Sequence, residues 1–257
     1  MKPLKKRIIS CKSTLPILLV ILQAFACQKL NDSQPLTNPA EKNLFIQFQH
    51  KIDQFSIRKN QDVQLSDGRR LRFQYIRHIF TNIYLINEQG DTVYPSLRRV
   101  LIRENETEYA LGKVLLPTGQ WKMYLLYGVD SLTNKTIQPS MVENAGDPLA
   151  PQFPSMYWTW ESGYLFTRIE ALADTSRVPS GQLNGFVDYH LGKTGLARWI
   201  GPFEVRVNNE KATINLNCDL QPAFQSIIWP EEFSSHTFEN VALAEKILNH
   251  IAQNIKE

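Results

Sequence analysis

The feature that most constrains this chain is an alternation of apolar and polar residues that begins near residue 44. Leu44, Ile46, Phe48, His50 and Ile52 fall on one face of an extended segment, and the polar residues between them fall on the other. Successive side chains of a β-strand point to opposite faces, so the pattern predicts a strand with one face toward a core. His50 is then a core-facing residue.

Short runs of strand character recur along the rest of the chain. Turn residues separate them, as in Ser66–Gly68, Asn87–Gly90 and Pro117–Gly119. With 43% hydrophobic residues the chain has enough apolar surface for a full core. Many short strands joined by Gly, Pro and Asn turns predict an all-β fold, an antiparallel β-sandwich. Segments on both sides of the Pro-rich stretch 147–154 look alike, so residues 43–257 are predicted to form one domain.

Only the end of the chain changes its period. Apolar residues from Val241 to Ile255 recur at spacings of three and four, which is typical of an amphipathic helix. Thr237 precedes them and is predicted as the N-cap. We therefore expect a C-terminal α-helix against the sandwich.

The first 26 residues have the composition of a secretory signal peptide. They hold five basic residues and no acidic one, and Leu15–Ala26 is almost entirely apolar. Without this segment, 23 basic and 25 acidic residues remain, a formal charge of −2. A protein of that balance lacks the positive surface that nucleic-acid binding needs.

The end of this leader fits two processing routes. Ala24–Ala26 suits ordinary signal cleavage, and the small residues before Cys27 also resemble a bacterial lipobox, in which Cys27 is acylated. Residues 27–42 are predicted as a lipid-attachment cysteine and a flexible, polar tether. The expected location is the periplasm or the cell envelope. Cys218 then has no cysteine partner within the domain.

Common catalytic motifs are absent from the sequence. It has no Gly-x-Ser-x-Gly elbow, no phosphate-binding Gly-rich loop, no Cys-x-x-Cys and no His-Glu-x-x-His. Glu231 and Glu232 are adjacent, but a solvated pair of this kind is weak evidence for a glycosidase. A hydrolase on a sandwich scaffold would also need a nucleophile and a base, and no such pair is evident. We expect a protein that is not itself an enzyme.

The histidines are the most informative polar residues. A core-facing His50 must satisfy its ring nitrogens, either by a hydrogen bond or by a metal ion. Asp188 and His190 are two positions apart on one strand face, where the carboxylate can orient the imidazole. His236 precedes the predicted helix, whose positive end favours a neutral imidazole. The remaining two are predicted to be surface or boundary residues: His78 and His250.

A cluster of aromatic residues gives three alternatives. Trp158 and Trp160 are two positions apart and share a face if the segment is extended. They fit a core strand or lid, a platform on which sugar rings stack, or aromatic rings beside an oxidisable metal.

Several segments together resemble the MbnP-like family of exported copper-binding proteins. The resemblance spans residues 43–255, and its most specific parts are Trp158-Thr159-Trp160 and His190-Leu191-Gly192. The other matching segments are Phe48–His50, Phe80–Leu85, Pro117–Gly119, Gly128–Ser131, Arg168–Glu170 and the closing helix.

The resemblance implies a β-sandwich that binds copper through histidines and acts with a dihaem, peroxidase-like partner. In that family the partner oxidises a tryptophan to kynurenine, which then contributes to the metal site. Carried over by position, the implied ligands are His50 and His190, with His236 as a third candidate, and the tryptophans implied for oxidation are Trp158 and Trp160. Asp188, on the same strand face as His190, is the expected supporting residue. We expect the three imidazoles to meet at one point. The alternative is a non-catalytic, glycan-binding surface lipoprotein that uses the two tryptophans as a platform.

Overall fold

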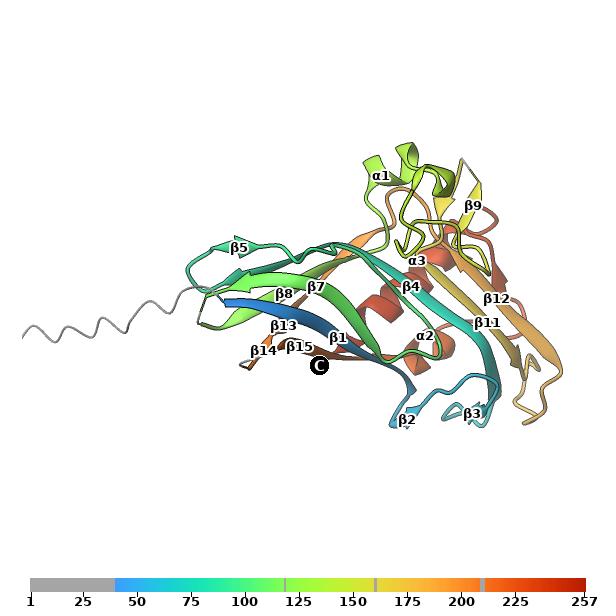
Figure 1. The fold of residues 1–257 in the computed structure, drawn as a ribbon. Helices are drawn as coiled ribbons and strands as arrows, with labels where there is room; N and C mark the ends of the chain where they lie inside the picture. The colour runs from blue at the N-terminus through green and yellow to red at the C-terminus, as the bar shows by residue number, and fades with distance from the viewer. Residues whose placement is uncertain (1–39, 118, 160, 209–210) are drawn as a thin grey trace, which may run out of the picture. The chain divides into compact units, whose positions relative to one another are not determined.

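The computed structural model describes residues 40–117, 119–159, 161–208 and 211–257 of the chain. These residues belong to one compact unit and are mostly strands (Figure 1). The strands are β1 (Ala40–Ile52), β2 (Phe55–Ser56), β3 (Asp62–Gln64), β4 (Arg70–Asn87), β5 (Thr92–Val93), β6 (Val100–Ile102), β7 (Glu108–Leu116), β8 (Trp121–Tyr127), β9 (Tyr157–Thr159), β10 (Gly163–Tyr164), β11 (Thr167–Ala173), β12 (Gly185–Leu191), β13 (Arg198–Glu204), β14 (Arg206–Val207), β15 (Lys211–Asp219), β16 (Ser234–Ser235) and β17 (Ile255–Lys256). The helical segments are α1 (Ser131–Thr136), the 3-10 turn Pro139–Met141, α2 (Gln221–Gln225) and α3 (Val241–Gln253).

The first sheet is organised around β1. The strand has the predicted alternation, and its inner residues, Leu44 to Ile52, are buried. β1 pairs antiparallel with β7 and β2. On its other edge it pairs parallel with β15, which places His50 opposite Cys218. This parallel pair is the main departure from a purely antiparallel sandwich.

The second sheet is organised around β4, which is 18 residues long. Its strand order is β13-β8-β4-β11-β12-β16, and β3, β5 and β6 also pair with β4. β11 and β12 are antiparallel neighbours, whereas the short β16 runs parallel to β12. A separate two-stranded ribbon, β9 and β10, carries the tryptophan motif.

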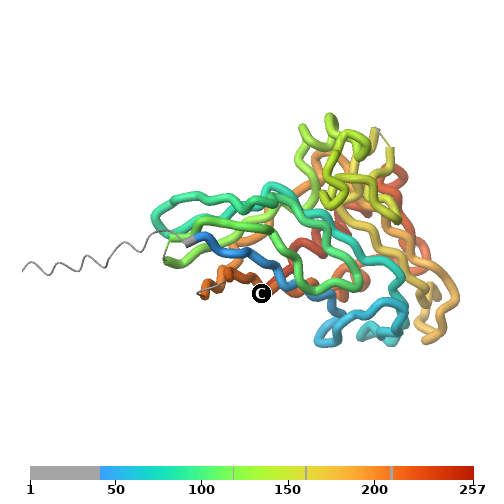
Figure 2. The backbone as a smooth tube through the Cα atoms, viewed as in Figure 1, coloured from blue at the N-terminus to red at the C-terminus, as the bar shows by residue number. Residues whose placement is uncertain are grey.

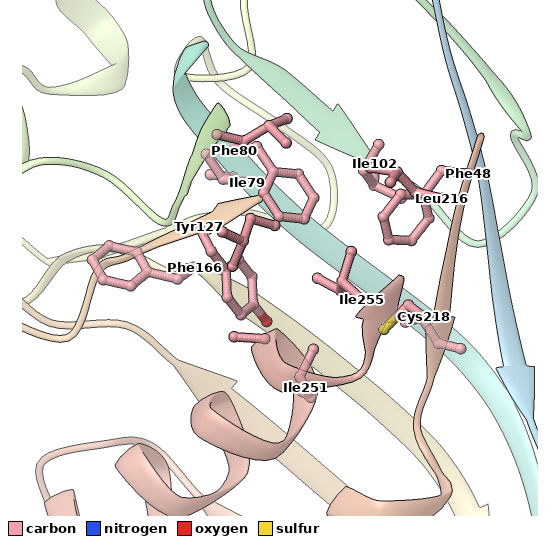
Figure 3. Packing of buried hydrophobic residues seen from close by; sticks show 14 of the residues in the cluster. Phe48, Ile79, Phe80, Ile102, Tyr127, Phe166, Leu216, Cys218, Ile251 and Ile255 are labelled. Carbon is pink, nitrogen blue, oxygen red and sulfur yellow. The ribbon is translucent and has the colours of Figure 1, made fainter. Parts of the chain in front are cut away.

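The inner faces of the two sheets enclose the core. The rings of Phe48 in β1 and Phe80 in β4 have centroids 5.9 Å apart, so the sheets are in direct contact. Figure 3 shows Cys218 and Ile255 in the same cluster as Tyr127. The prediction of an all-β sandwich with a C-terminal helix is confirmed in its class.

The C-terminal helix begins later than predicted. The N-cap is Asn240, whose Oδ1 accepts a hydrogen bond from the Leu243 amide at 3.0 Å. Thr237 is therefore not the cap; it has a positive φ of 64° and uses its hydroxyl to hold another strand. The buried face of α3, which includes Leu248 and Ile251, packs beside β12 and β13, and the tube in Figure 2 follows the chain to this end in red.

Most of the predicted leader and tether lies outside the described residues. This includes the signal peptide (1–26) and Cys27. β1 already begins at Ala40, so the last three residues of the predicted tether belong to the first sheet. In the described ranges, none of the helices has both the length and the apolar character needed to cross a bilayer.

Candidate metal centre

The centre begins with the alternation of side chains along β12. Val187, Tyr189 and Leu191 are buried on the inner face of this strand. Asp188 and His190, at the intervening positions, therefore project from the opposite face, as the sequence predicts. The neighbouring β11 supplies Arg168 and Glu170 to the same face, because they pair directly with His190 and Asp188.

His236 reaches the same place through a local strand pairing. β16 runs parallel to β12, with Ser234 beside Asp188 and Ser235 beside Tyr189. The hydroxyl of Thr237 accepts a hydrogen bond from the Gly192 amide at 3.0 Å and donates one to the His190 carbonyl at 3.1 Å. These contacts hold the two histidine-bearing segments together although 46 positions separate the residues in sequence.

The three side chains form a compact set of donor atoms. One ligand atom each from Asp188, His190 and His236 lie within 4.8 Å of one another. Asp188 Oδ1 is 2.8 Å from His190 Nε2, and Asp188 Oδ2 is 3.2 Å from His236 Nε2. His190 is buried, and the other two side chains are half-buried. An ion at this point is reachable from the surface but is partly shielded from water.

Hydrogen bonds do not satisfy every polar atom of these three side chains. His190 Nε2 is also 2.9 Å from Glu170 Oε1, and a ring nitrogen carries at most one proton, so it cannot donate to both carboxylates. Among the described residues Asp188 Oδ1 and His190 Nδ1 have no hydrogen-bond partner. These unsatisfied atoms make the group a candidate for holding a metal ion.

The carboxylate of Asp188 is ionised near neutral pH. Burial raises its pKa, but the neighbouring His190 and His236 rings stabilise the charged carboxylate and more than offset burial, so the net pKa is lowered. An ionised carboxylate is what a metal ion needs as a ligand.

Trp158 lies against both imidazoles. It comes from β9, and the Arg168 guanidinium donates to the Ser155 carbonyl just before this strand at 3.0 Å. The Trp158 ring stacks on His236 with centroids 5.3 Å apart and planes 20° apart, and it is 5.2 Å from His190. Its side chain is 45% exposed. The centre thus joins two imidazoles, a carboxylate and an accessible indole.

The position of Trp158 bears on the alternatives for the tryptophan motif. It is neither a core residue nor a lid, because almost half of it is exposed. One ring face is occupied by His236, so a sugar could stack only on the other face. Trp160 lies outside the described residues. The two-ring glycan platform therefore stays a prediction.

His50 does not join this centre, so the expectation that three imidazoles meet at one point is wrong. His50 packs against His78, with ring centroids 5.2 Å apart. His78 pairs with Thr167, and Thr167 pairs with Leu191, so His78 is on the inner face of this sheet. His190 projects from the outer face. The alternation of residues in β1 predicted correctly that His50 faces the core. It could not show that the centre at His190 lies on the outer face of the other sheet.

The sequence interpretation also missed two residues. His78 was predicted to be a surface or boundary residue and is fully buried instead. Glu170 was not assigned a role, yet it is hydrogen-bonded to His190. The alternation Arg168–Ile169–Glu170 on a strand, beside Asp188 and His190, is the signal that indicates a polar outer face at this point.

The fold and the centre define a class of protein: a domain built of strands, with a group of two histidines and a carboxylate that could hold a metal ion beside an indole. The chain belongs to the MbnP family, whose model matches residues 41–241. The resemblance predicted from the sequence is thereby confirmed.

A solved structure agrees with this assignment at the level of the fold. MbnP from Methylosinus trichosporium has a similar fold, with a TM-score of 0.52 over 77% of this chain and 84% of that chain, at 15% sequence identity. No curated protein sequence matches this chain.

Proposed function

We propose that this protein binds copper at Asp188, His190 and His236, next to Trp158. The observation that carries the proposal is the set of three donor atoms within 4.8 Å, which includes a buried Asp188 oxygen without a hydrogen-bond partner in the described residues. Membership of the MbnP family supports copper as the metal. We infer that the protein handles copper rather than catalysing a reaction, since its sequence offers no nucleophile and base pair.

The donor set suits copper. Imidazole nitrogens bind Cu, Zn, Fe and Ni, and Cu²⁺ binds most tightly of the divalent first-row ions. Glu239 contacts Nδ1 of His236, the ring nitrogen that does not face Asp188, as the outer partner of a metal-binding histidine does. Glu170 instead lies beside His190 Nε2 itself. When bound, the copper ion would bring redox capability to a point against the Trp158 ring.

Trp158 is our proposed target for oxidation to kynurenine. It is the described tryptophan that touches both imidazoles, and its exposed edge is open to a partner protein. Conversion breaks the C2–C3 bond of the indole, adds oxygen and releases C2 as formate, so it needs an external oxidant. We propose a dihaem, peroxidase-like partner that consumes peroxide as the source of oxidising equivalents.

We further propose that the protein is exported and held at the cell envelope. The basic, apolar segment 1–26 and the small residues before Cys27 support a signal peptide followed by lipid attachment. Mass spectrometry of the native N-terminus tests this point: an acylated Cys27 supports the anchor, and an unmodified N-terminus at this position contradicts it.

Copper titration of the purified protein tests the centre. We expect His190→Ala and His236→Ala each to weaken copper binding by more than the roughly 10- to 100-fold that loss of an outer partner costs. His250→Ala is the matched control, because His250 is on α3 and outside the centre. Unchanged copper affinity in the His190→Ala, His236→Ala double variant contradicts the proposed centre.

A further inference from the structure

A second pair of imidazoles lies in the core, away from the centre at Asp188. His50 on β1 is 5% exposed and His78 on β4 is 0% exposed. Their ring centroids are 5.2 Å apart, with the planes at 39°. The two sheets each contribute one ring, so the pair bridges the sandwich.

Both rings have a nitrogen without a partner. His50 Nε2 and His78 Nε2 are fully buried, and no hydrogen-bond partner is found for either among the described residues. Buried polar atoms are normally satisfied, because an unpaired one loses its hydration without compensation. The two rings are neighbours, so a single ligand between the sheets could satisfy both atoms.

The second nitrogen of His78 is held in a manner typical of a metal ligand. Its Nδ1 is 3.1 Å from the Tyr127 hydroxyl and 3.0 Å from the Thr167 hydroxyl. If Nδ1 donates its proton to either oxygen, Nε2 keeps a free lone pair. Histidines that bind metals usually donate from the other ring nitrogen in this way.

Protons do not compete strongly for these rings. Burial lowers the pKa of His50 to about 4, although Glu104 partly offsets the effect. Burial and the neighbouring His50 lower the pKa of His78 well below its ordinary value. Both rings are neutral at physiological pH, the form in which imidazole binds a metal.

An opening from the surface reaches His50. It lines a cavity of about 390 Å³, bounded by the segments 56–59 and 104–107. Glu104 at this cavity is paired with Lys59 at 3.2 Å and Arg77 at 3.3 Å, so two cations compensate its charge. The cavity therefore extends to the His50 side chain, although its Nε2 atom is itself buried.

The donors select the kind of ion. Among the described residues, one group of three possible metal donors is found, and it consists of Asp188, His190 and His236. In the same residues, His50 and His78 therefore have no third histidine, cysteine or carboxylate donor close enough to complete a site. Structural zinc takes four ligands, and a divalent charge between two neutral donors in a dry core is unfavourable. A soft monovalent ion that accepts two imidazoles fits better.

We propose that His50 and His78 form a second metal site that binds one Cu⁺ ion through their unpaired Nε2 atoms. The proposal goes beyond the copper centre at His190 and His236 and does not depend on it. Cys218, which lies in the core cluster (Figure 3), pairs with His50 in the strand register. It is the obvious competing ligand, because thiolate is soft. Burial raises the pKa of its thiol, which disfavours the thiolate in the metal-free protein. The two unpaired Nε2 atoms are therefore assigned as the donors, and the Cys218→Ala variant tests this assignment.

Anaerobic Cu⁺ titration of the purified protein against the chelator bathocuproine disulfonate tests the proposal. The His190→Ala, His236→Ala double variant should still bind one Cu⁺, and adding His78→Gln or His50→Gln should weaken that binding by at least about 100-fold. Cys218→Ala and His250→Gln in the same background should retain it. No Cu⁺ in the double variant, or loss in Cys218→Ala with retention in His78→Gln, overturns the proposal.

The two proposals fail in different ways. If only the core site exists, the unaltered protein and the double variant both bind one Cu⁺. If only the outer centre exists, the unaltered protein binds one and the double variant binds none.

Substitution of a buried histidine could prevent folding, so a second measurement uses the unaltered protein. In ¹⁵N-histidine NMR of the unaltered protein, Cu⁺ should shift the Nε2 resonances of His50 and His78 together, while the His250 resonances stay in place. Unmoved Nε2 resonances for both rings at saturating Cu⁺ rule the site out.

Discussion

The two pairs of histidines in this protein have opposite surroundings. His190 and His236 lie at an outer face of the second sheet, where carboxylates crowd their ring nitrogens. His50 and His78 lie between the sheets, where the described residues leave both Nε2 atoms unpaired. Around the outer pair, the carboxylate oxygens outnumber the ring protons that could bind them. In the inner pair, each ring has one nitrogen that finds no hydrogen-bond partner. A metal ion would satisfy either arrangement, but by different donors and with a different dependence on pH.

The largest effect should come from protonation of the inner pair. The pKa of His50 falls from 6.5 in the unfolded chain to about 4 in the folded protein. Between these values the unfolded state binds more protons, so stability is present above pH 6.5 and is lost as the pH falls toward 4. The shift corresponds to about 3 kcal/mol for His50.

Urea unfolding of the metal-free protein at pH 7, 6, 5 and 4 measures this loss. His50→Gln should remove much of it, whereas His236→Gln should leave it in place. The pKa of Asp188 is lowered from its ordinary value, so its contribution to stability is lost only at pH values below that value. It therefore does not contribute to the change measured between pH 7 and pH 4. Equal pH dependence in His50→Gln and the unaltered protein would contradict burial as the cause.

Asp188→Asn should weaken copper binding at the outer centre alone. The change keeps the shape of the side chain and removes the charged ligand between His190 and His236, so affinity should fall by at least the roughly 10- to 100-fold that loss of an outer partner costs. Copper titration measures the change. Glu239→Gln is the control, since Glu239 contacts only the far nitrogen of His236 and is exposed; an equal loss there would mean that general surface charge, not the Asp188 ligand, holds the ion.

His50→Leu should stabilise the metal-free protein. It replaces a buried imidazole that has an unpaired nitrogen with an apolar side chain, which we expect to raise the free energy of unfolding by about 1 kcal/mol. His190→Leu should lower it, because Glu170 loses its imidazole partner. Thermal or urea unfolding at pH 7 compares the two, and destabilisation by both changes would show that the inner pair is only a packing element.

The smallest effect concerns Trp158. Because its ring is half exposed, Trp158→Phe should lower the free energy of unfolding by less than about 1 kcal/mol. Copper at the outer centre should quench Trp158 fluorescence, since the indole touches both imidazoles. The same fractional quenching in Trp158→Phe would place the ion elsewhere.

Local patterns predicted much of the fold and part of the centre. The alternation from Leu44 to Ile52 predicted β1 and the burial of His50, and the spacing of Asp188 and His190 predicted their shared face. Both depend on the two-residue period of a strand, which is a local property. The helical period predicted α3, but its first turn was misplaced because Thr237 caps no helix and instead holds β12.

The sequence by itself determined which residues face inward, where the chain turns and which polar side chains share a strand face, because backbone geometry links neighbouring residues directly. Only the tertiary structure decided which histidines meet. The short β16 brought His236 to His190, and sheet packing brought His50 to His78 instead. Such meetings depend on strand order and on which sheet faces which, and no period along the chain records either.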